Sequence, residues 1–166
     1  MSSNASFHIR PARKGDAALI LGLIRELATY EKLSHEVVAT EQEIDAQLFG
    51  AHPHAEAVIA EYAGEPAGFA LFFHNFSTFL ARPGLYLEDL YVKPEFRGKG
   101  FGKKLLAHLA RLALQRGCGR FEWAVLDWNT PAIRFYESLG AKIVDEWKIN
   151  RMTGEALRKL AQSAEA

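Results

Sequence analysis

The segment Arg97-Gly98-Lys99-Gly100-Phe101-Gly102 is the part of this chain whose residue types and spacing most clearly indicate chemistry. It joins a strand-like run, Leu85 to Val92, to a helix-like run that reaches Arg116. Glycines let the backbone approach a ligand closely, and the first turn of a helix presents unpaired N–H groups and the positive end of the helix dipole. These properties predict a site for a phosphate or pyrophosphate group.

Two common phosphate-binding loops do not fit this segment. A P-loop requires G-x-x-x-x-G-K-[ST], but Gly98 lies four residues before Gly102, and Lys103 is followed by Lys104. The Rossmann fingerprint requires a glycine where Lys103 stands. The remaining pattern, R-x-x-G-x-G, resembles the acyl-CoA pyrophosphate loop of the Gcn5-related N-acetyltransferases (GNAT family).

The resemblance extends over nearly the whole chain. The flanking motifs are similar to the diamine/polyamine (spermidine/spermine) N-acetyltransferase branch of that family. They are Ile24-Arg25-Glu26-Leu27-Ala28-x-Tyr30-Glu31, Tyr86-Leu87-Glu88-Asp89 and Trp128-Asn129-x-Pro131-x-x-x-Phe135-Tyr136-x-x-x-Gly140-Ala141. The resemblance implies transfer of acetyl from acetyl-CoA, as cosubstrate, to a primary amine of a small polyamine or diamine by direct attack.

The same resemblance implies which residues hold acetyl-CoA. The backbone of the strand that ends at Val92 would bond the pantetheine arm, the glycine loop would hold the pyrophosphate, and the segment around Asn129 would help hold the donor. The implied set is Leu90, Tyr91, Val92, Arg97, Gly98, Lys99, Gly100, Phe101, Gly102, Lys103, Asn129, Thr130, Pro131, Ala132 and Tyr136. In this family the strand also bulges, which leaves an N–H free to polarise the thioester carbonyl.

Glu88 is the implied base that takes a proton from the amine. Strict alternation would place Glu88 on one face of its strand with Tyr86, Leu90 and Val92, and Asp89 on the opposite face with Leu85, Leu87 and Tyr91. A strand that is buried on both faces has no structural need for two carboxylates. An edge strand or a buried salt bridge with an arginine would also explain them, and Glu88 could bind the ammonium as a counter-ion without acting as a base.

Tyr136 is the implied acid that protonates the departing thiolate. A phenol and a thiol have comparable acidities, so this transfer is chemically reasonable. Tyr136 also fits an apolar helix face with Ile133, Phe135 and Leu139, which is the alternative structural role.

The acceptor site is implied to lie between the end of the first helix and two strands. Its residues are Tyr30, Glu31, Glu88, Glu122, Trp123 and Ala124. Glu31 and Glu88 would suit a cation with two amines, although Glu31 could also be a solvated charge at a helix end. A lysine-like amino acid such as thialysine, or a peptide amine, is the first alternative acceptor; its carboxylate would need a cation, for which Arg10, Arg82 and Lys148 are candidates. A non-catalytic acyl-CoA sensor is the second alternative.

Composition restricts the class of protein. A chain of 166 residues that is 49% hydrophobic fits a single domain over residues 1–166, with 1–6 disordered. Lys plus Arg and Asp plus Glu are 20 each, which disfavours a nucleic-acid or membrane partner. The single Cys118 and the absence of a long apolar run favour a cytoplasmic protein without a disulfide. No metal site is expected, because His52-Pro53-His54 lacks supporting ligands; the resemblance implies a homodimer that involves the C-terminal segment.

Hydrophobic periodicity predicts the elements that position these residues. Strands are expected at Phe7–Arg10, Ala55–Tyr62, Ala67–His74, Leu85–Val92, Phe121–Leu126 and within Ala141–Ile149. Helices are expected after Asp16, after Thr40 with a capping box to Glu43, from Phe101, from a Thr130 N-cap and over Gly154–Ala161. An aromatic loop is expected over Asn75–Arg82. The pattern predicts an α/β (α+β) fold with a central mixed, mostly antiparallel sheet and helices on both faces, the GNAT acyltransferase fold.

Overall fold

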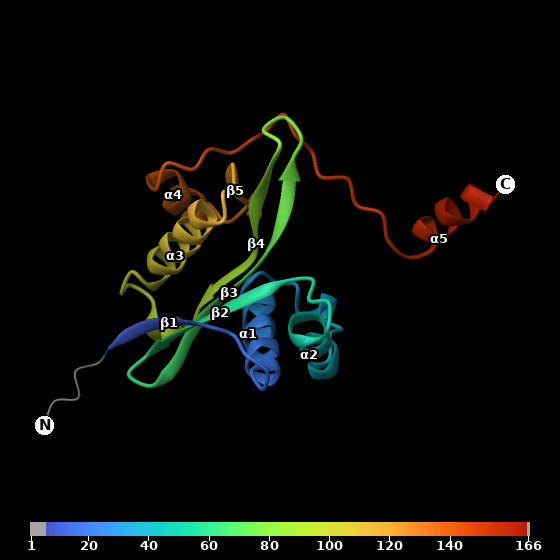
Figure 1. Cartoon of the computed structure of the whole chain (residues 1–166). Helices are drawn as coiled ribbons and strands as arrows, with labels where there is room; N and C mark the ends of the chain where they lie inside the picture. The colour runs from blue at the N-terminus through green and yellow to red at the C-terminus, as the bar shows by residue number, and fades with distance from the viewer. Residues whose placement is uncertain (1–5, 166) are drawn as a thin grey trace, which may run out of the picture. The chain divides into compact units, whose positions relative to one another are not determined.

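The computed structural model of the chain describes residues 6–165 (Figure 1). Within it, the chain up to Leu126 forms one compact unit and the chain from Asp127 forms another. The expectation of a single domain over residues 1–166 stays a prediction. Of the segment expected to be disordered, residues 1–5 lie outside the described residues, and Ser6 precedes the first strand, where its carbonyl accepts a hydrogen bond from the Ala63 N–H.

A five-stranded sheet forms the centre of the first unit, in the order β1-β2-β3-β4-β5. The strands are β1 (Phe7–Pro11), β2 (Glu56–Tyr62), β3 (Glu65–Ser77), β4 (Arg82–Val92) and β5 (Arg120–Trp123). Neighbouring strands are antiparallel except β4 and β5, which are parallel. The predicted mixed, mostly antiparallel sheet is therefore confirmed.

Helices cover both faces of this sheet. They are α1 (Ala17–Tyr30), α2 (Glu41–Phe49) and α3 (Phe101–Gln115), with short 3₁₀ turns at Ser34–Glu36 and Pro94–Phe96. On one face, Phe69 of β3 packs in a buried cluster with Ile20 and Leu23 of α1. On the other face, Phe72 lies beneath Arg116, which directly follows α3. Phe69 and Phe72 are separated by three positions in one strand, and successive side chains of a strand point to opposite faces of the sheet, so the two rings lie on opposite faces.

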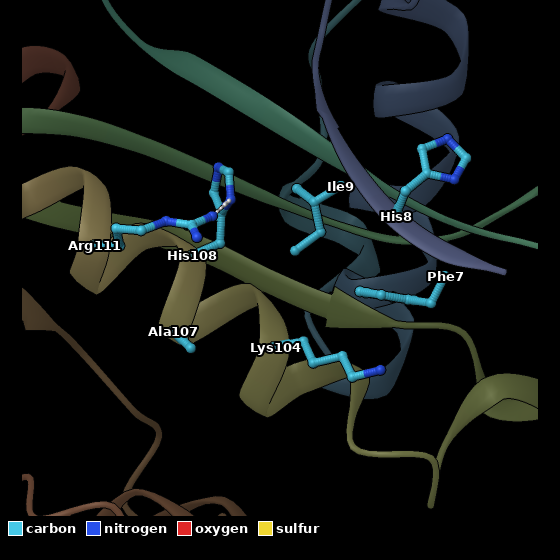
Figure 2. Close-up of a pocket in the computed structure, with 7 residues that line it drawn as sticks. All are labelled: Phe7, His8, Ile9, Lys104, Ala107, His108 and Arg111. Atoms are coloured by element: carbon cyan, nitrogen blue, oxygen red, sulfur yellow. Dashed lines mark hydrogen bonds between the residues drawn. The ribbon is translucent and has the colours of Figure 1, made fainter.

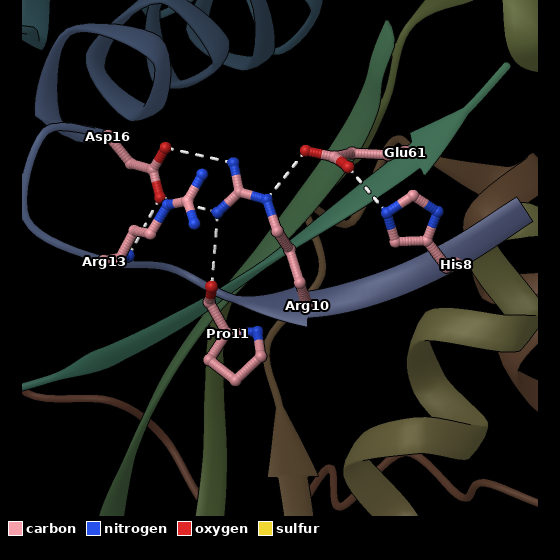
Figure 3. A network of polar contacts seen from close by, with 6 residues as sticks. All are labelled: His8, Arg10, Pro11, Arg13, Asp16 and Glu61. Atoms are coloured by element: carbon pink, nitrogen blue, oxygen red, sulfur yellow. Dashed lines mark hydrogen bonds and ion pairs between the residues drawn. The ribbon is translucent and has the colours of Figure 1, made fainter. Parts of the chain in front are cut away.

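Polar contacts tie the edge strand β1 to the rest of this unit (Figure 3). Arg10 bonds both oxygens of Asp16, at 2.7 and 3.0 Å, and also Glu61 at 2.7 Å. Asp16 accepts a further bond from the Arg13 N–H. It is the N-cap residue of α1, but its side chain makes no capping hydrogen bond to the helix. Thr40 and Glu43 form the predicted capping box at the start of α2.

A β-bulge at Glu88 interrupts the ladder between β3 and β4. Leu87 pairs with Phe72 and Asp89 pairs with Leu71, so Glu88 has no partner in this register. The extra residue reverses the alternation that follows it. The predicted assignment of β4 side chains to the two faces of the sheet is therefore wrong. The side chains on the α3 face are those of Leu85, Leu87, Leu90 and Val92. The side chains on the α1 face are those of Tyr86, Asp89 and Tyr91.

Several predicted boundaries also need correction. The segment Asn75–Arg82 is half strand, because β3 runs to Ser77 and β4 starts at Arg82, which leaves only residues 78–81 as the turn. The last residues of the predicted Phe121–Leu126 strand lie beyond β5, which ends at Trp123. No described helix is long and apolar enough to cross a membrane.

The second unit contains α4 (Thr130–Ser138), α5 (Gly154–Gln162) and a final 3₁₀ turn at Ser163–Glu165. The N-cap of α4 is Asn129, whose side chain accepts a bond from the Ala132 N–H, and not Thr130 as predicted. The prediction of strands within Ala141–Ile149 is wrong for this structure, since no strand is present there. A strand needs a neighbour to pair with, and the apolar side chains of this segment are exposed instead.

Candidate active site

The glycine loop has the geometry expected of an anion site. Gly98 and Gly100 adopt left-handed backbone angles, with φ of 78° and 77°, which other residues reach only at a cost. The first bond within α3 runs from the Lys104 N–H to the Gly100 carbonyl, and no side chain caps the helix. The N–H groups of Phe101, Gly102 and Lys103 therefore lack intrahelical partners and can bind a pyrophosphate.

Arg97, the first residue of the motif, links the end of β4 to the end of α1. Its Nε donates to the Val92 carbonyl at 2.9 Å. Its guanidinium carbon lies 5.1 Å from the centre of the Tyr30 ring and 5.6 Å from that of Tyr91, distances typical of cation–π contacts. The residue predicted for the donor site thus also supports Tyr30, a residue predicted for the acceptor site.

The outer part of β4 extends beyond its neighbour β5. Their register covers only Gly84 to Leu87 of β4, opposite Arg120 to Trp123. From Asp89 to Val92, β4 pairs with β3 alone, so one edge of its backbone is not part of a ladder with β5. Backbone groups on this edge can bond an extended ligand, which agrees with the predicted role of Leu90, Tyr91 and Val92.

Three carboxylates from α1 and the bulge lie close enough to influence one another. Burial and the charges of Glu88 and Glu31 raise the pKa of Asp89 to about 6. Burial also raises the pKa of Glu31, the C-cap residue that directly follows α1. We call Glu31, Glu88 and Asp89 the acidic cluster; like charges in a partly buried place attract a cation strongly. Glu31 is thus not simply a solvated helix-end charge.

Asp89 is the site residue that the sequence reasoning missed. It is an acid in an apolar strand, but the strict alternation expected from the sequence places it on the face opposite Glu88. The bulge brings Asp89 to the α1 face, where Glu31 lies, while Glu88 remains exposed at the bulge itself. The available signal was the pair of adjacent acids in a strand otherwise suited to burial on both faces.

Asp89→Asn is expected to stabilise the fold at neutral pH. The folded-state pKa of Asp89 lies above its ordinary value of 3.8, so this carboxyl destabilises the fold increasingly as the pH rises from 3.8 to about 6, and by a constant amount at higher pH. The variant's advantage over the wild type in unfolding free energy should be larger at pH 8 than at pH 5 by on the order of 1 kcal/mol, after allowance for solvent screening. Urea unfolding at both pH values measures this. Asp45→Asn on α2 is the control, and a gain independent of pH would contradict the assignment.

The three residues predicted on β5 and just after it occupy different surroundings. Glu122 pairs in register with Tyr86, and its carboxylate lies 2.7 Å from Arg120 Nε and accepts a 3.1 Å bond from the Asn75 amide. Trp123 lies opposite Leu87, on the other face, with its ring 4.9 Å from that of Phe121. Ala124 is exposed beyond the strand. Glu122 thus shares the sheet face of Asp89.

The remaining predicted residues belong to the second unit. Asn129 is buried at the start of α4, and Thr130, Pro131 and Ala132 form the first turn of that helix. Tyr136 lies in the same helix, with its ring 5.5 Å from that of Phe135. Their roles in donor binding and proton transfer stay predictions.

Comparison with known proteins identifies the family. A model of the acetyltransferase (GNAT) family matches residues 23–141. The chain belongs to the GNAT family. It is therefore an acetyl-CoA-dependent amine N-acetyltransferase, and the glycine loop described above fits the pyrophosphate of that cosubstrate.

The relatives of this GNAT acetyltransferase act on different amines. It is 45% identical to the thialysine N-epsilon-acetyltransferase of Sus scrofa over 168 residues, which cover 95% of this chain and 98% of the relative. It is 34% identical to an L-ornithine N5-acetyltransferase of Arabidopsis thaliana over 92% of this chain and 86% of the relative. A spermidine/spermine N(1)-acetyltransferase-like protein of Homo sapiens is 31% identical over 93% of this chain but 24% of the relative.

A solved structure agrees with the predicted GNAT fold. An integron cassette protein from the mobile metagenome of V. cholerae superposes with a TM-score of 0.80 at 30% identity, over 95% of this chain and 98% of that chain. Within residues 6–165 of the acetyltransferase, no group of three or more His, Cys, Asp or Glu residues is placed to hold a metal ion.

Proposed function

We propose that this enzyme acetylates the side-chain amine of a lysine-like amino acid of the thialysine type. Two relatives that match most of the chain are named for amino-acid acceptors, thialysine and L-ornithine. The polyamine acceptor that the motifs favoured is less well supported, because the spermidine/spermine relative is more distant. The amino acid, which was the alternative from sequence, becomes the main proposal.

The acidic cluster is the observation that carries this proposal. A thialysine-type acceptor carries a side-chain ammonium and an α-ammonium, and Glu31, Glu88 and Asp89 together offer negative charge for such groups. Tyr30, beside the end of α1, would form a wall of the acceptor site.

The acceptor's carboxylate needs a positive partner. Arg10 already bonds two carboxylates, Asp16 and Glu61, so its charge is balanced. Arg82 begins β4, six residues before Glu88, which places it roughly 20 Å along the strand. Arg97, in contrast, lies against the Tyr30 ring and can provide positive charge beside the acceptor site. Lys148 stays a candidate from the second unit.

The proposed chemistry assigns one task to each group. Glu88 accepts a proton from the acceptor ammonium, directly or through water, so that the neutral amine can attack the thioester carbonyl. A backbone N–H freed by the bulge donates a hydrogen bond to that carbonyl oxygen as negative charge develops there. The new C–N bond forms and the C–S bond breaks, and Tyr136 donates a proton to the departing thiolate. The acylated nitrogen loses its second proton to water, and the Tyr136 phenolate recovers a proton from solvent.

A panel of amines tests the acceptor. We expect release of CoA from acetyl-CoA with a kcat/KM at least about tenfold higher for thialysine, lysine or ornithine than for putrescine, spermidine or spermine, because a matched polar contact discriminates by at least this factor. A lysine-containing peptide tests the remaining alternative acceptor. Preference for the polyamines would overturn the amino-acid proposal and restore the first prediction, and preference for the peptide would move the acceptor to a protein.

We also propose that the enzyme is a homodimer of the cytoplasm. The C-terminal segment supports the dimer, because its large apolar side chains are exposed. They are Ile143, Val144, Trp147, Ile149, Met152, Leu157 and Leu160. Exposed apolar groups in such number favour burial against another chain.

A further inference from the structure

A groove lies between β1 and α3 (Figure 2). It adjoins the glycine loop, because its lining residue Phe7 stacks on Phe101 with ring centres 4.3 Å apart, but it contains no residue of the acidic cluster. It has a volume of about 410 Å³, within the range of small-molecule sites. Its lining residues are Phe7, His8, Ile9, Lys104, Ala107, His108 and Arg111. Phe7 and Ile9 point from β1 toward α3, while the His8 ring points away from α3 and pairs with Glu61.

The polar wall of the groove comes from one stripe of α3. Lys104, His108 and Arg111 follow the i, i+4, i+7 spacing that places side chains on one helix face. Arg111 Nη2 lies 3.4 Å from His108 Nδ1. Arginine only donates, so Nδ1 accepts and the neutral ring carries its proton on Nε2. Burial, and after it the Arg111 charge, lower the pKa of His108, so the neutral ring is favoured beside Arg111.

The two permanent cations of the stripe have no carboxylate to balance them. Across residues 6–165, neither Lys104 nor Arg111 forms an ion pair. Lys104 instead lies over two rings that stack on each other, with its Nζ 4.6 Å from the centre of Phe7 and 5.6 Å from that of Phe101. A cation so placed can still accept an anion on its open side.

The edge of β1 adds hydrogen-bonding groups. The Ser6 carbonyl accepts from Ala63, and the Ala12 N–H donates to Ala57, which fixes the even-numbered residues of β1 as those bonded to β2. In an antiparallel pair the intervening residues direct their N–H and C=O groups outward. Phe7 and Ile9 are the intervening residues that line the groove.

We propose that this groove binds a small organic anion, with its phosphate or carboxylate held by Lys104 and Arg111 and its apolar part against Phe7 and Ile9. The anionic end replaces the missing carboxylate partners, and the apolar end covers the β1 side chains. The groove is thus a second ligand site on the helix whose first turn carries the donor loop.

Phenyl phosphate is the probe, added to protein saturated with CoA so that the glycine loop is already filled. Two-dimensional amide NMR should show saturable shifts at Phe7, Ile9 and Ala107. Lys104→Met/Arg111→Gln should weaken binding at least about tenfold, since two charge-assisted contacts are lost. Lys14→Gln, an exposed charge in the loop before α1, should bind as the wild type does.

Two further ligands separate the contribution of the anionic group from that of the aromatic ring. Benzyl alcohol, which lacks the charge, and inorganic phosphate, which lacks the ring, should each bind at least about threefold more weakly than phenyl phosphate. The absence of saturable shifts at the three groove amides would overturn the proposal. So would equal affinity of the double variant and the wild type, provided that the variant's amide spectrum shows an intact fold.

Discussion

Glu88→Gln is expected to lower kcat/KM for the amine acceptor by about 10² to 10⁴, the usual contribution of a general base. Glutamine keeps the size of the side chain but cannot accept the proton of the acceptor ammonium. Glu88 is suited to this task because the bulge leaves it outside the β3 ladder and exposed. Steady-state release of CoA at saturating acetyl-CoA measures the effect, together with its dependence on pH.

The control for this variant separates loss of a base from loss of charge. Glu65→Gln, at the exposed start of β3, removes one negative charge without touching the acidic cluster and should leave kcat/KM unchanged. If Glu88 acts only as a counter-ion, its variant should raise KM and preserve kcat. An unaltered rate with an unaltered pH profile would remove Glu88 from the mechanism altogether.

Tyr136→Phe is expected to lower kcat by a comparable factor, about 10² or more, while acetyl-CoA binding changes little. The substitution removes the hydroxyl that would protonate the thiolate but keeps the ring beside Phe135. Turnover measured next to equilibrium binding of CoA separates the two effects. If Tyr136 has only a packing role, Tyr136→Phe should lower the free energy of unfolding and leave kcat unchanged.

Tyr62→Phe is the matched control for Tyr136→Phe. The Tyr62 ring lies 5.2 Å from that of Phe101, and phenylalanine preserves this packing. We expect turnover close to that of the wild type. If both variants lost activity equally, the effect of Tyr136→Phe would reflect general loss of a tyrosine hydroxyl rather than proton transfer.

Local sequence patterns predicted most of the first unit. The apolar spacing after Asp16 and the Thr40–Glu43 capping box each act over a few residues, so they can be recognised in the chain, and both predictions are confirmed. The glycine loop belongs to the same class, because left-handed angles and free N–H groups are properties of a short segment.

Interactions between distant segments could not be predicted in this way. The extent of β3 and β4 was underestimated because pairing between the two strands continues into a segment whose composition resembles a loop. Strands in Ala141–Ile149 were predicted from apolar residues, but a strand also needs a partner edge, which local composition does not reveal.

The acidic cluster shows this division most clearly. The sequence alone predicted the donor loop, Glu31 and Glu88, because the family motifs are contiguous runs of residues. The folded structure placed Asp89 with Glu31, since a single unpaired residue at Glu88 shifts every later side chain of β4 to the opposite face. That shift depends on how β4 pairs with β3, which is a property of two strands and not of the residues of β4 themselves.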